Sequence, residues 1–345
     1  MVRLPFSDKR RGEHAAPTAG RPAVRAADSP PAQESAPQEK TSLRQETTPA
    51  VPPADWAPLV IGDPIFDFEP KPPAPGACLA DSVLDGWSTR HFTVRLASVR
   101  GYGHRYGGVS RQDDAIARHD RASGAVVIAV ADGVSSAPQS HVGAAAACQA
   151  AVRAVLEALA ARHGHVDWSL VIETVVERLQ RCARKLLRDP GADLRATEES
   201  LATTLIVGYV LPDASGAIAE FVQVGDSGGW LLHRGRFYPV LAEKNQADQP
   251  ILSSAVSPLP RFPGRLAPAR FRLPPGSVLL IGTDGFGDPL GDGTGMVGQV
   301  FARHLRTPPP APAFAHLLDF SRETFDDDRT LVAVWPQPPL PDPRR

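Results

Sequence analysis

The sequence predicts an α+β domain in which two stacked, mostly antiparallel β-sheets are flanked by helices. The order of the expected elements is one reason, because strands come first, two long helices follow, and further strands precede the last helices. The strands do not alternate regularly with helices, as they would in a parallel α/β sheet. Turn-forming residues between successive strands of the second half also favour stacked sheets over a βαβ winding.

The first half of the folded part contains two expected strands and two expected helices. Apolar residues alternate with others over residues 92–97, which predicts a half-buried strand, and the apolar run 126–131 predicts a buried one. The segment 143–162 is rich in alanine and free of proline, so it favours a helix. Apolar residues recur at helical spacing over 169–188, which predicts a second helix.

The second half returns to strand patterns. Short segments rich in β-branched and other apolar residues are separated by turn formers, and two helical segments precede a closing strand. The expected elements are strands at 203–211, 217–225, 229–232, 277–282 and 330–335 and helices at 296–305 and 314–323.

The two ends of the chain differ from the middle in composition. Residues 1–76 hold 15 of the 36 prolines and few large apolar side chains, so burial cannot offset the entropy of ordering them. We therefore predict a Pro/Ala-rich disordered arm at 1–76, a folded domain at 77–336 and a tail at 337–345. The more apolar stretch 56–68 could dock on the domain or on a partner, although a plain tail is the favoured interpretation.

Charge and cysteine content exclude several classes of protein. The 37 Lys and Arg residues nearly balance the 38 Asp and Glu residues, which gives no reason to expect nucleic acid or a membrane surface as a partner. Three scattered cysteines without a CxxC pair exclude a disulfide scaffold or a zinc ribbon. The charged N-terminus is unlike a signal peptide, and the longest apolar runs are shorter than the roughly 20 residues of a membrane span. We expect a cytoplasmic monomer.

Aspartates recur beside the ends of the expected strands. They are Asp113, Asp114, Asp132, Asp226, Asp284 and the run Asp326 to Asp328. Rigid strand ends can direct several carboxylates at one point, but the carboxylates then need a counter-charge. Hard divalent cations such as Mg²⁺ or Mn²⁺ supply that charge and prefer oxygen ligands. Any one of these residues alone is more typical of a turn, so the prediction depends on the ordered set.

Six sequence blocks resemble, in order, those of the metal-dependent type 2C Ser/Thr protein phosphatases. The blocks are GGVSRQDDA, VIAVADGVSSA, ATTLIVGYV, VQVGDSGGWLL, LLIGTDGFGD and DDRTLVAVW. Each block is weak alone, but together they cover nearly the whole folded part. The resemblance implies an α-β-β-α sandwich of bacterial type with a two-metal centre at one edge of the sheets.

The resemblance also assigns metal ligands. Asp132 would bridge two Mn²⁺ or Mg²⁺ ions, and the main-chain carbonyl of Gly133 would help to hold the second ion. Asp284 and Asp327 would bind the first ion. The additional acid Asp328, where the family has asparagine, leaves open a shift of this last assignment by one position.

Three further aspartates receive supporting roles from the resemblance. Asp113 takes the place of the family's glutamate and Asp114 that of its aspartate, both acting through water. Asp226 matches the carboxylate that can hold a third ion.

The groups that would contact phosphate and protonate the leaving oxygen depart from the family pattern. Arg111 is the first choice for gripping phosphate and Arg105 the second, since neither occupies the family's arginine position. Val134 replaces the family's histidine, so His141 or His104 would have to act as general acid. A structural role for each of these side chains remains open.

We therefore expect a phosphoprotein phosphatase that hydrolyses phosphoserine and phosphothreonine through a water activated by two metal ions. The resemblance implies that it acts opposite a Ser/Thr protein kinase in the same pathway. One alternative is a catalytically weak, phosphatase-like regulator that binds phosphoproteins or a kinase. Another is a hydrolase of small phosphate esters. The missing arginine and histidine favour the regulator, whereas the complete carboxylate set favours the enzyme.

Overall fold

A computed structural model describes residues 59–66, 68, 80–161, 165–214, 216–241, 258–261 and 266–337. Within the segment Pro53–Arg345, these residues belong to one compact unit. Most of the arm predicted at 1–76 (residues 1–58, 67 and 69–76) and all but Gln337 of the tail predicted at 337–345 lie outside the described residues, where both stay predictions.

Within the described ranges, the strands form two larger antiparallel sheets. The first contains five strands in the order β10-β7-β6-β5-β4, and the second contains six in the order β2-β3-β13-β11-β8-β9. The strands of the first sheet are β4 (Asp114–His119), β5 (Val126–Ala131), β6 (Leu205–Asp213), β7 (Gly216–Val224) and β10 (Ala269–Leu273). Those of the second are β2 (Ser82–Ser88), β3 (Phe92–Val99), β8 (Gly228–His233), β9 (Arg236–Pro239), β11 (Ser277–Gly282) and β13 (Arg329–Pro336).

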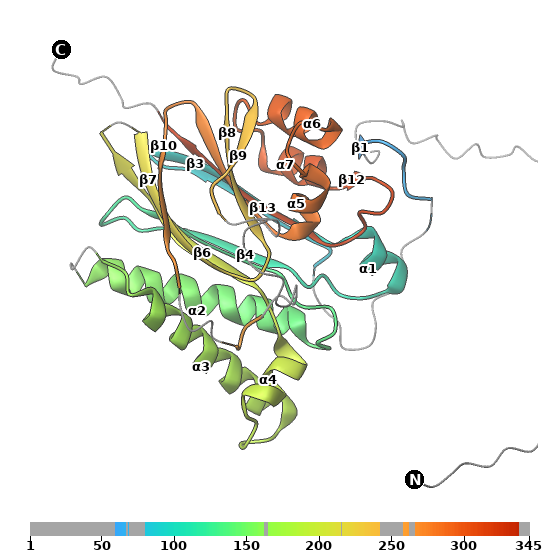
Figure 1. The fold of residues 1–345 in the computed structure, drawn as a ribbon, viewed down its shortest axis with the longest axis vertical. Coiled ribbons are helices and arrows are strands. Elements are labelled where there is room, and N and C mark those ends of the chain that lie inside the picture. The colour runs from blue at the N-terminus through green and yellow to red at the C-terminus, as the bar shows by residue number, and fades with distance from the viewer. Residues whose placement is uncertain are drawn as a thin grey trace, which may run out of the picture. The chain divides into compact units, whose positions relative to one another are not determined.

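Helices cover the outer face of each sheet (Figure 1). The five-stranded sheet packs against α2 (Ser140–Ala160), which in turn packs against α3 (Trp168–Leu187). The other sheet carries α5 (Asp284–Leu290), α6 (Met296–His304) and α7 (Ala311–Leu318). Separate apolar clusters fill the space between the two sheets and the space under each helical layer. This arrangement confirms the predicted α-β-β-α sandwich.

The buried strand β5 and the helix α2 show why the sequence adopts these layers. All six residues of β5 are fully buried, because one face of the strand packs on the other sheet and the opposite face packs on α2. The alanines that α2 turns to the sheet, among them Ala144, Ala147 and Ala151, are small enough for close approach. The helix is long and apolar enough to cross a membrane, but half of it is buried against the sheet, as expected for a core helix.

One part of the predicted arm belongs to the domain, which corrects the expectation of a plain tail at 56–68. The strand β1 (Leu59–Val60) pairs in parallel with β12 (Phe320–Ser321), and Ile61 is buried among the side chains of α5, α6 and α7. The apolar side chains of this short stretch offset the cost of ordering it. The segment continues to Phe66, whose ring contacts that of Tyr106.

Other differences concern short or polar elements. The expected helix at 314–323 ends at Leu318, and the chain then extends into β12. The short helices α1 (Tyr102–Gly107) and α4 (Leu194–Leu201) carry too few apolar residues to show a pattern, although the Asp193 side chain caps α4 by accepting from Ala196 N. The segment 242–257, between β9 and β10, lies outside the described residues.

Candidate metal centre

Strand register brings the predicted aspartates to one edge of the sandwich. In the five-stranded sheet Asp114 at the start of β4 pairs with Ala131 at the end of β5, so the neighbouring Asp132 lies at the same edge. In the other sheet Gly282 at the end of β11 pairs with Leu331 near the start of β13. Because β13 runs antiparallel to β11, the residues just after β11 and just before β13 are also neighbours.

The two threonines of the third sequence block fix the main chain of Asp132. The Thr203 hydroxyl donates to Asp132 O at 2.9 Å, and Thr204 N donates to the same oxygen at 2.7 Å. Asp132 N donates to the Thr204 hydroxyl at 3.0 Å. The backbone polar groups of Asp132 are thus satisfied by protein, which leaves its carboxylate to face the other acids.

A threonine hydroxyl also holds Asp113, in this case through the carboxylate side chain. It is 3% exposed, and its Oδ2 accepts a hydrogen bond from the Thr283 hydroxyl at 2.8 Å. Burial raises the pKa of Asp113 well above its ordinary value, and the charge of Asp328 raises it further. The hydroxyls of Thr283 and Thr330 oppose that rise by stabilising the carboxylate.

The charges converge most strongly on Asp132. Burial is the largest cause that raises the pKa of Asp132 well above its ordinary value, followed by the charges of Asp113 and Asp284. Asp327 contributes as well, and its own pKa is raised first by loss of hydration and then, among charges, by Asp328. Carboxylates crowded in this way without a cation must take up protons, so the donor set fits hard divalent ions that prefer oxygen ligands.

The structure separates the roles of Asp327 and Asp328. Asp328 is 2% exposed, and its carboxylate accepts from Gly101 N at 2.7 Å and from Gln112 N at 2.5 Å. Asp327 is exposed and lines a surface pocket. Asp327 is therefore the more accessible of the two acids, and Asp328 fastens the loops before α1 and β4 to the loop before β13. The assignment of Asp327 as a metal ligand stays a prediction.

Two glycines allow backbones to approach the acids closely. A Cβ at Gly285 would lie 1.9 Å from Asp328 O, and a Cβ at Gly133 would lie 2.8 Å from Gln112 O. Since no side chain fits at either position, the Asp-Gly pairs at 132–133 and 284–285 serve packing as well as the site.

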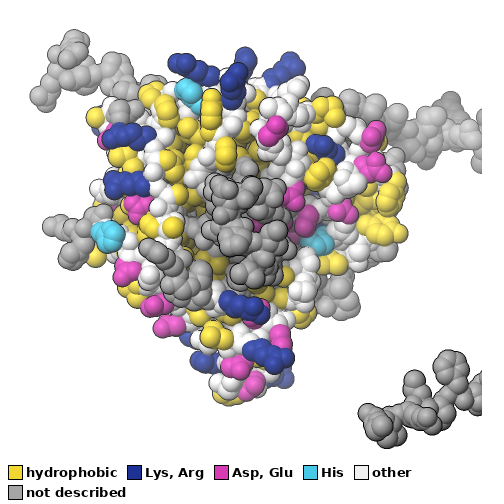
Figure 2. Space-filling model, in the orientation of Figure 1, with side chains coloured by type: hydrophobic (Ala, Val, Ile, Leu, Met, Phe, Trp, Pro, Cys, Tyr) yellow, Lys and Arg dark blue, Asp and Glu magenta, His cyan; other side chains and the backbone are white. Residues whose placement is uncertain are grey.

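The open side of the centre is an acidic pocket. Its lining includes Asp284, Asp326, Asp327 and also Asp288, which lies one turn along α5 from Asp284 and had no predicted role. Acidic side chains gather near the position of α5 on the face shown in Figure 2. The helical spacing of four residues between Asp284 and Asp288 is the sequence signal that could have found the additional acid.

Asp114 and Asp226 are the two remaining predicted acids. Burial raises the pKa of Asp114 while Arg111 opposes that rise, and Asp114 O accepts a weak contact from Cys148 Sγ at 3.5 Å. Asp226 occupies the turn between β7 and β8 and is not among the main charges that shift the pKa of Asp132 or Asp113. The acids whose charges act most on Asp132 are thus Asp113, Asp284 and Asp327.

Arg111 does not occupy the position predicted for a phosphate contact. Its side chain is 4% exposed, and Nη1 donates to Ser98 Oγ at 2.6 Å and to the main-chain oxygen of Asp113. This corrects the prediction, because a buried guanidinium committed to protein oxygens is unable to reach a substrate at the surface. Arg105, the second choice, is also committed, with Nη1 donating to Asp319 Oδ1 at 2.8 Å.

The two histidines differ in their relation to the acids. His141 is half-buried in the first turn of α2, and burial alone lowers its pKa. His104 in α1 places Nδ1 2.9 Å from Asp328 Oδ1, and potential ligand atoms of His104, Asp327 and Asp328 lie within 4.8 Å of one another. Burial lowers the pKa of His104, but the adjacent Asp328 carboxylate outweighs this effect and raises the pKa overall. The structure thus places His104, rather than His141, beside the acids.

Comparison with known proteins decides the family. Residues 100–320, more than half of the chain, match the family model described as protein phosphatase 2C. The chain belongs to the protein phosphatase 2C family. Membership confirms the predicted class of enzyme, a protein-serine/threonine phosphatase that depends on Mn²⁺ or Mg²⁺. A search of curated proteins found no match.

Solved structures similar to this protein phosphatase 2C chain are distant in sequence. The S. agalactiae serine/threonine phosphatase is 16% identical, with a TM-score of 0.48, and the match covers 71% of this chain and 100% of that one. The M. tuberculosis serine/threonine phosphatase PstP/Ppp is 17% identical, with a TM-score of 0.46 and coverage of 71% and 98%. RsbX, solved in complex with magnesium, is 15% identical, with a TM-score of 0.46 and coverage of 74% and 100%. The family assignment depends on the family model and not on these structures.

Proposed function

We propose that the chain hydrolyses phosphoserine and phosphothreonine in proteins, using a water activated by two divalent cations at the described acidic edge. The observation that carries the proposal is the placement of several aspartates at the edge where the Thr283–Asp113 hydrogen bond joins the two sheets, since crowded carboxylates call for bound cations. Asp132, the Gly133 carbonyl, Asp284 and Asp327 would hold the ions.

The remaining assignments support this proposal. Asp113 and Asp114 would act through water, and Asp226 would hold a third ion from the turn between β7 and β8. When bound, the cations lower the pKa of water and offset the charge of the phosphoryl oxygens. The chain itself supplies carboxylates next to rigid strand ends, which would hold the ions in place before the substrate binds.

A second candidate function is a phosphatase-like protein with weak catalysis that binds phosphoproteins or a Ser/Thr kinase. The specific observation in its favour is Arg111, whose guanidinium is committed to Ser98 and Asp113 and does not face the pocket. Action opposite such a kinase, a cytoplasmic location and a monomeric state all remain proposals for either function.

The test is Mn²⁺-dependent release of phosphate from a phosphothreonine peptide and from p-nitrophenyl phosphate. We expect turnover by the wild type and at least about a hundredfold loss in Asp132→Asn, because that change removes a shared ligand charge. Turnover no greater than that of Asp132→Asn would support the weak regulator instead. Turnover of sugar phosphates but not of the peptide would support a hydrolase of small esters.

A further inference from the structure

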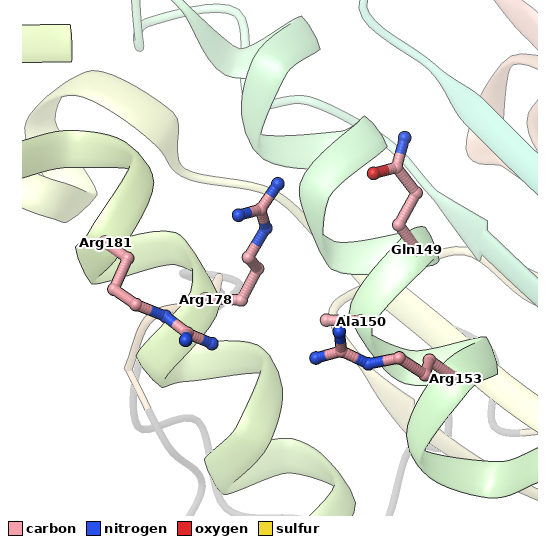
Figure 3. Close-up of a pocket in the computed structure, with 5 residues that line it drawn as sticks. All are labelled: Gln149, Ala150, Arg153, Arg178 and Arg181. Carbon is pink, nitrogen blue, oxygen red and sulfur yellow. The ribbon is translucent and has the colours of Figure 1, made fainter. Parts of the chain in front are cut away.

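Three arginine side chains from two helices line one pocket on the outer helical layer (Figure 3). Arg153 comes from α2, and Arg178 and Arg181 come from α3, with Gln149 and Ala150 completing the lining. In Figure 3 the guanidinium group of Arg153 points from α2 toward α3, and that of Arg178 projects into the space between the helices. Guanidinium groups from both helices therefore line the same pocket.

The positive charge of this pocket is poorly compensated. In the part of the chain that the structure describes, Arg178 and Arg181 have no ion pair or hydrogen bond, and they lie three residues apart on the same face of α3. Arg153 has one partner, with Nε 3.7 Å from Glu157 Oε1, and both side chains are more than half exposed. Such an exposed ion pair contributes little stabilising free energy and compensates little of the positive charge. The three guanidinium groups therefore repel one another unless an anion binds between them.

The geometry suits a tetrahedral oxyanion. Guanidinium groups present planar pairs of N–H donors that match two oxygens of a phosphate, and the Gln149 amide adds a neutral donor. We propose that the pocket between α2 and α3 binds a phosphoryl group through Arg153, Arg178, Arg181 and Gln149. The group is either free phosphate or the phosphate of a phosphorylated side chain. A membrane surface fits less well, because the arginines line a hollow between helices and not a raised face.

This pocket is separate from the metal centre. The first residue of α2, Ser140, packs against Gly133, where a Cβ would lie 2.8 Å from Ser140 Cβ. Gln149 and Arg153 follow about nine and 13 residues later, which corresponds to about 14 to 20 Å along the helix. Binding at the pocket is therefore expected without any metal ion, and the proposal does not depend on the proposed hydrolysis.

The test is calorimetric titration of the metal-free, full-length chain with inorganic phosphate and with a phosphothreonine peptide. The variant Arg178→Gln removes a pocket cation, and Lys185→Gln, on the same helix but outside the pocket lining, is the matched control for charge. We expect Arg178→Gln to weaken binding at least about tenfold, as loss of a charged hydrogen bond does, while Lys185→Gln binds as the wild type. If Arg178→Gln fails to fold, Arg181→Gln, whose side chain is exposed, replaces it.

The titrations distinguish free phosphate from a phosphorylated side chain as the ligand. Tighter binding of the peptide than of phosphate identifies a phosphorylated side chain as the ligand, and equal affinities identify the free anion. Absence of binding by the wild type, or equal binding by wild type and Arg178→Gln, would overturn the proposal. Binding to phosphatidylserine vesicles without binding to phosphate would overturn it as well. Hydrolysis of p-nitrophenyl phosphate should be the same in Arg178→Gln as in the wild type, which separates this test from that of the metal centre.

Discussion

The Thr283 hydroxyl donates a hydrogen bond to Asp113 Oδ2 at 2.8 Å and so joins the two sheets at the acidic edge. Thr283 follows β11 in the six-stranded sheet, and Asp113 precedes β4 in the five-stranded sheet. Thr283 is fully buried, and its hydroxyl oxygen also accepts from Thr330 N at 3.1 Å. One side chain therefore fixes an acid of one sheet relative to the acids of the other.

We predict that Thr283→Val lowers the free energy of unfolding by about 1–3 kcal/mol, because Asp113 is left buried without one of its donors. Urea denaturation of the purified chain measures the change. Thr174→Val is the matched control, since the Thr174 hydroxyl donates to Leu170 O of its own helix at an exposed position, and it should cost about 0.5 kcal/mol or less. Equal effects of the two changes would contradict the role of the bond between the sheets.

Removing one acid should stabilise the metal-free protein and should reduce the stabilisation that Mn²⁺ provides. In metal-free protein we expect Asp284→Asn to raise the melting temperature above that of the wild type, because the charge that raises the pKa of Asp132 is removed. In the wild type, Mn²⁺ at about 100 times its Kd should add about 2.7 kcal/mol, and the variant should gain much less. Thermal melts with and without Mn²⁺ test both statements, and a variant that gains as much as the wild type would contradict them.

The stability of the metal-free protein should depend on pH in a defined direction. Burial and neighbouring acids raise the folded-state pKa of Asp132 and Asp113 above the unfolded value of about 3.9. Their contribution to stability is therefore complete below that value and is lost as pH rises through the raised folded pKa. We expect the urea midpoint of the chelated wild type to fall more than that of Asp132→Asn as pH rises above the unfolded pKa of about 3.9. If the urea midpoints of the two proteins change equally with pH, the raised pKa values of these aspartates would be contradicted.

Close packing at the second Asp-Gly pair gives a sharper prediction. Gly285→Ala places a Cβ 1.9 Å from Asp328 O, so the loop before β13 must move. We expect a loss of stability of about 3 kcal/mol or more and loss of the Mn²⁺ response. Gly295→Ala is the control, because its Cβ would meet nothing within 4 Å, and as a change at the N-cap of α6 it should cost about 1 kcal/mol or less. Comparable losses in both variants would show that the close approach is not decisive.

The elements predicted best from the sequence are those with a strong local pattern. The apolar run of β5 and the helical spacing of α3 predicted buried elements that the structure has at nearly the same bounds. The strand β2, SVLDGWS, was missed because it lies at a sheet edge and is almost entirely exposed, so it carries no apolar alternation. The short stretch Leu59–Ile61 was assigned to the tail because its partner, β12, is distant in the sequence.

At the acidic edge too, local sequence patterns predicted some features, whereas contacts between distant segments were missed. Aspartates beside strand ends could be predicted because an antiparallel sheet brings such ends together, and four of them do converge. The direction of a long side chain is not encoded in sequence spacing, which is why Arg111 was expected to face phosphate and instead lies buried against Ser98. The contact between His104 and Asp328 joins the helix α1 to the loop before β13, which is distant in the sequence, so only the folded chain shows it.

Calorimetric titration of the purified wild-type chain with Mn²⁺ tests the central claim most directly. The account predicts uptake of about two ions per chain, and much weaker uptake by Asp132→Asn, because that aspartate lies at the centre of the converging charges. No uptake of Mn²⁺ or Mg²⁺ by the folded wild type would contradict the claim that these carboxylates form a metal centre.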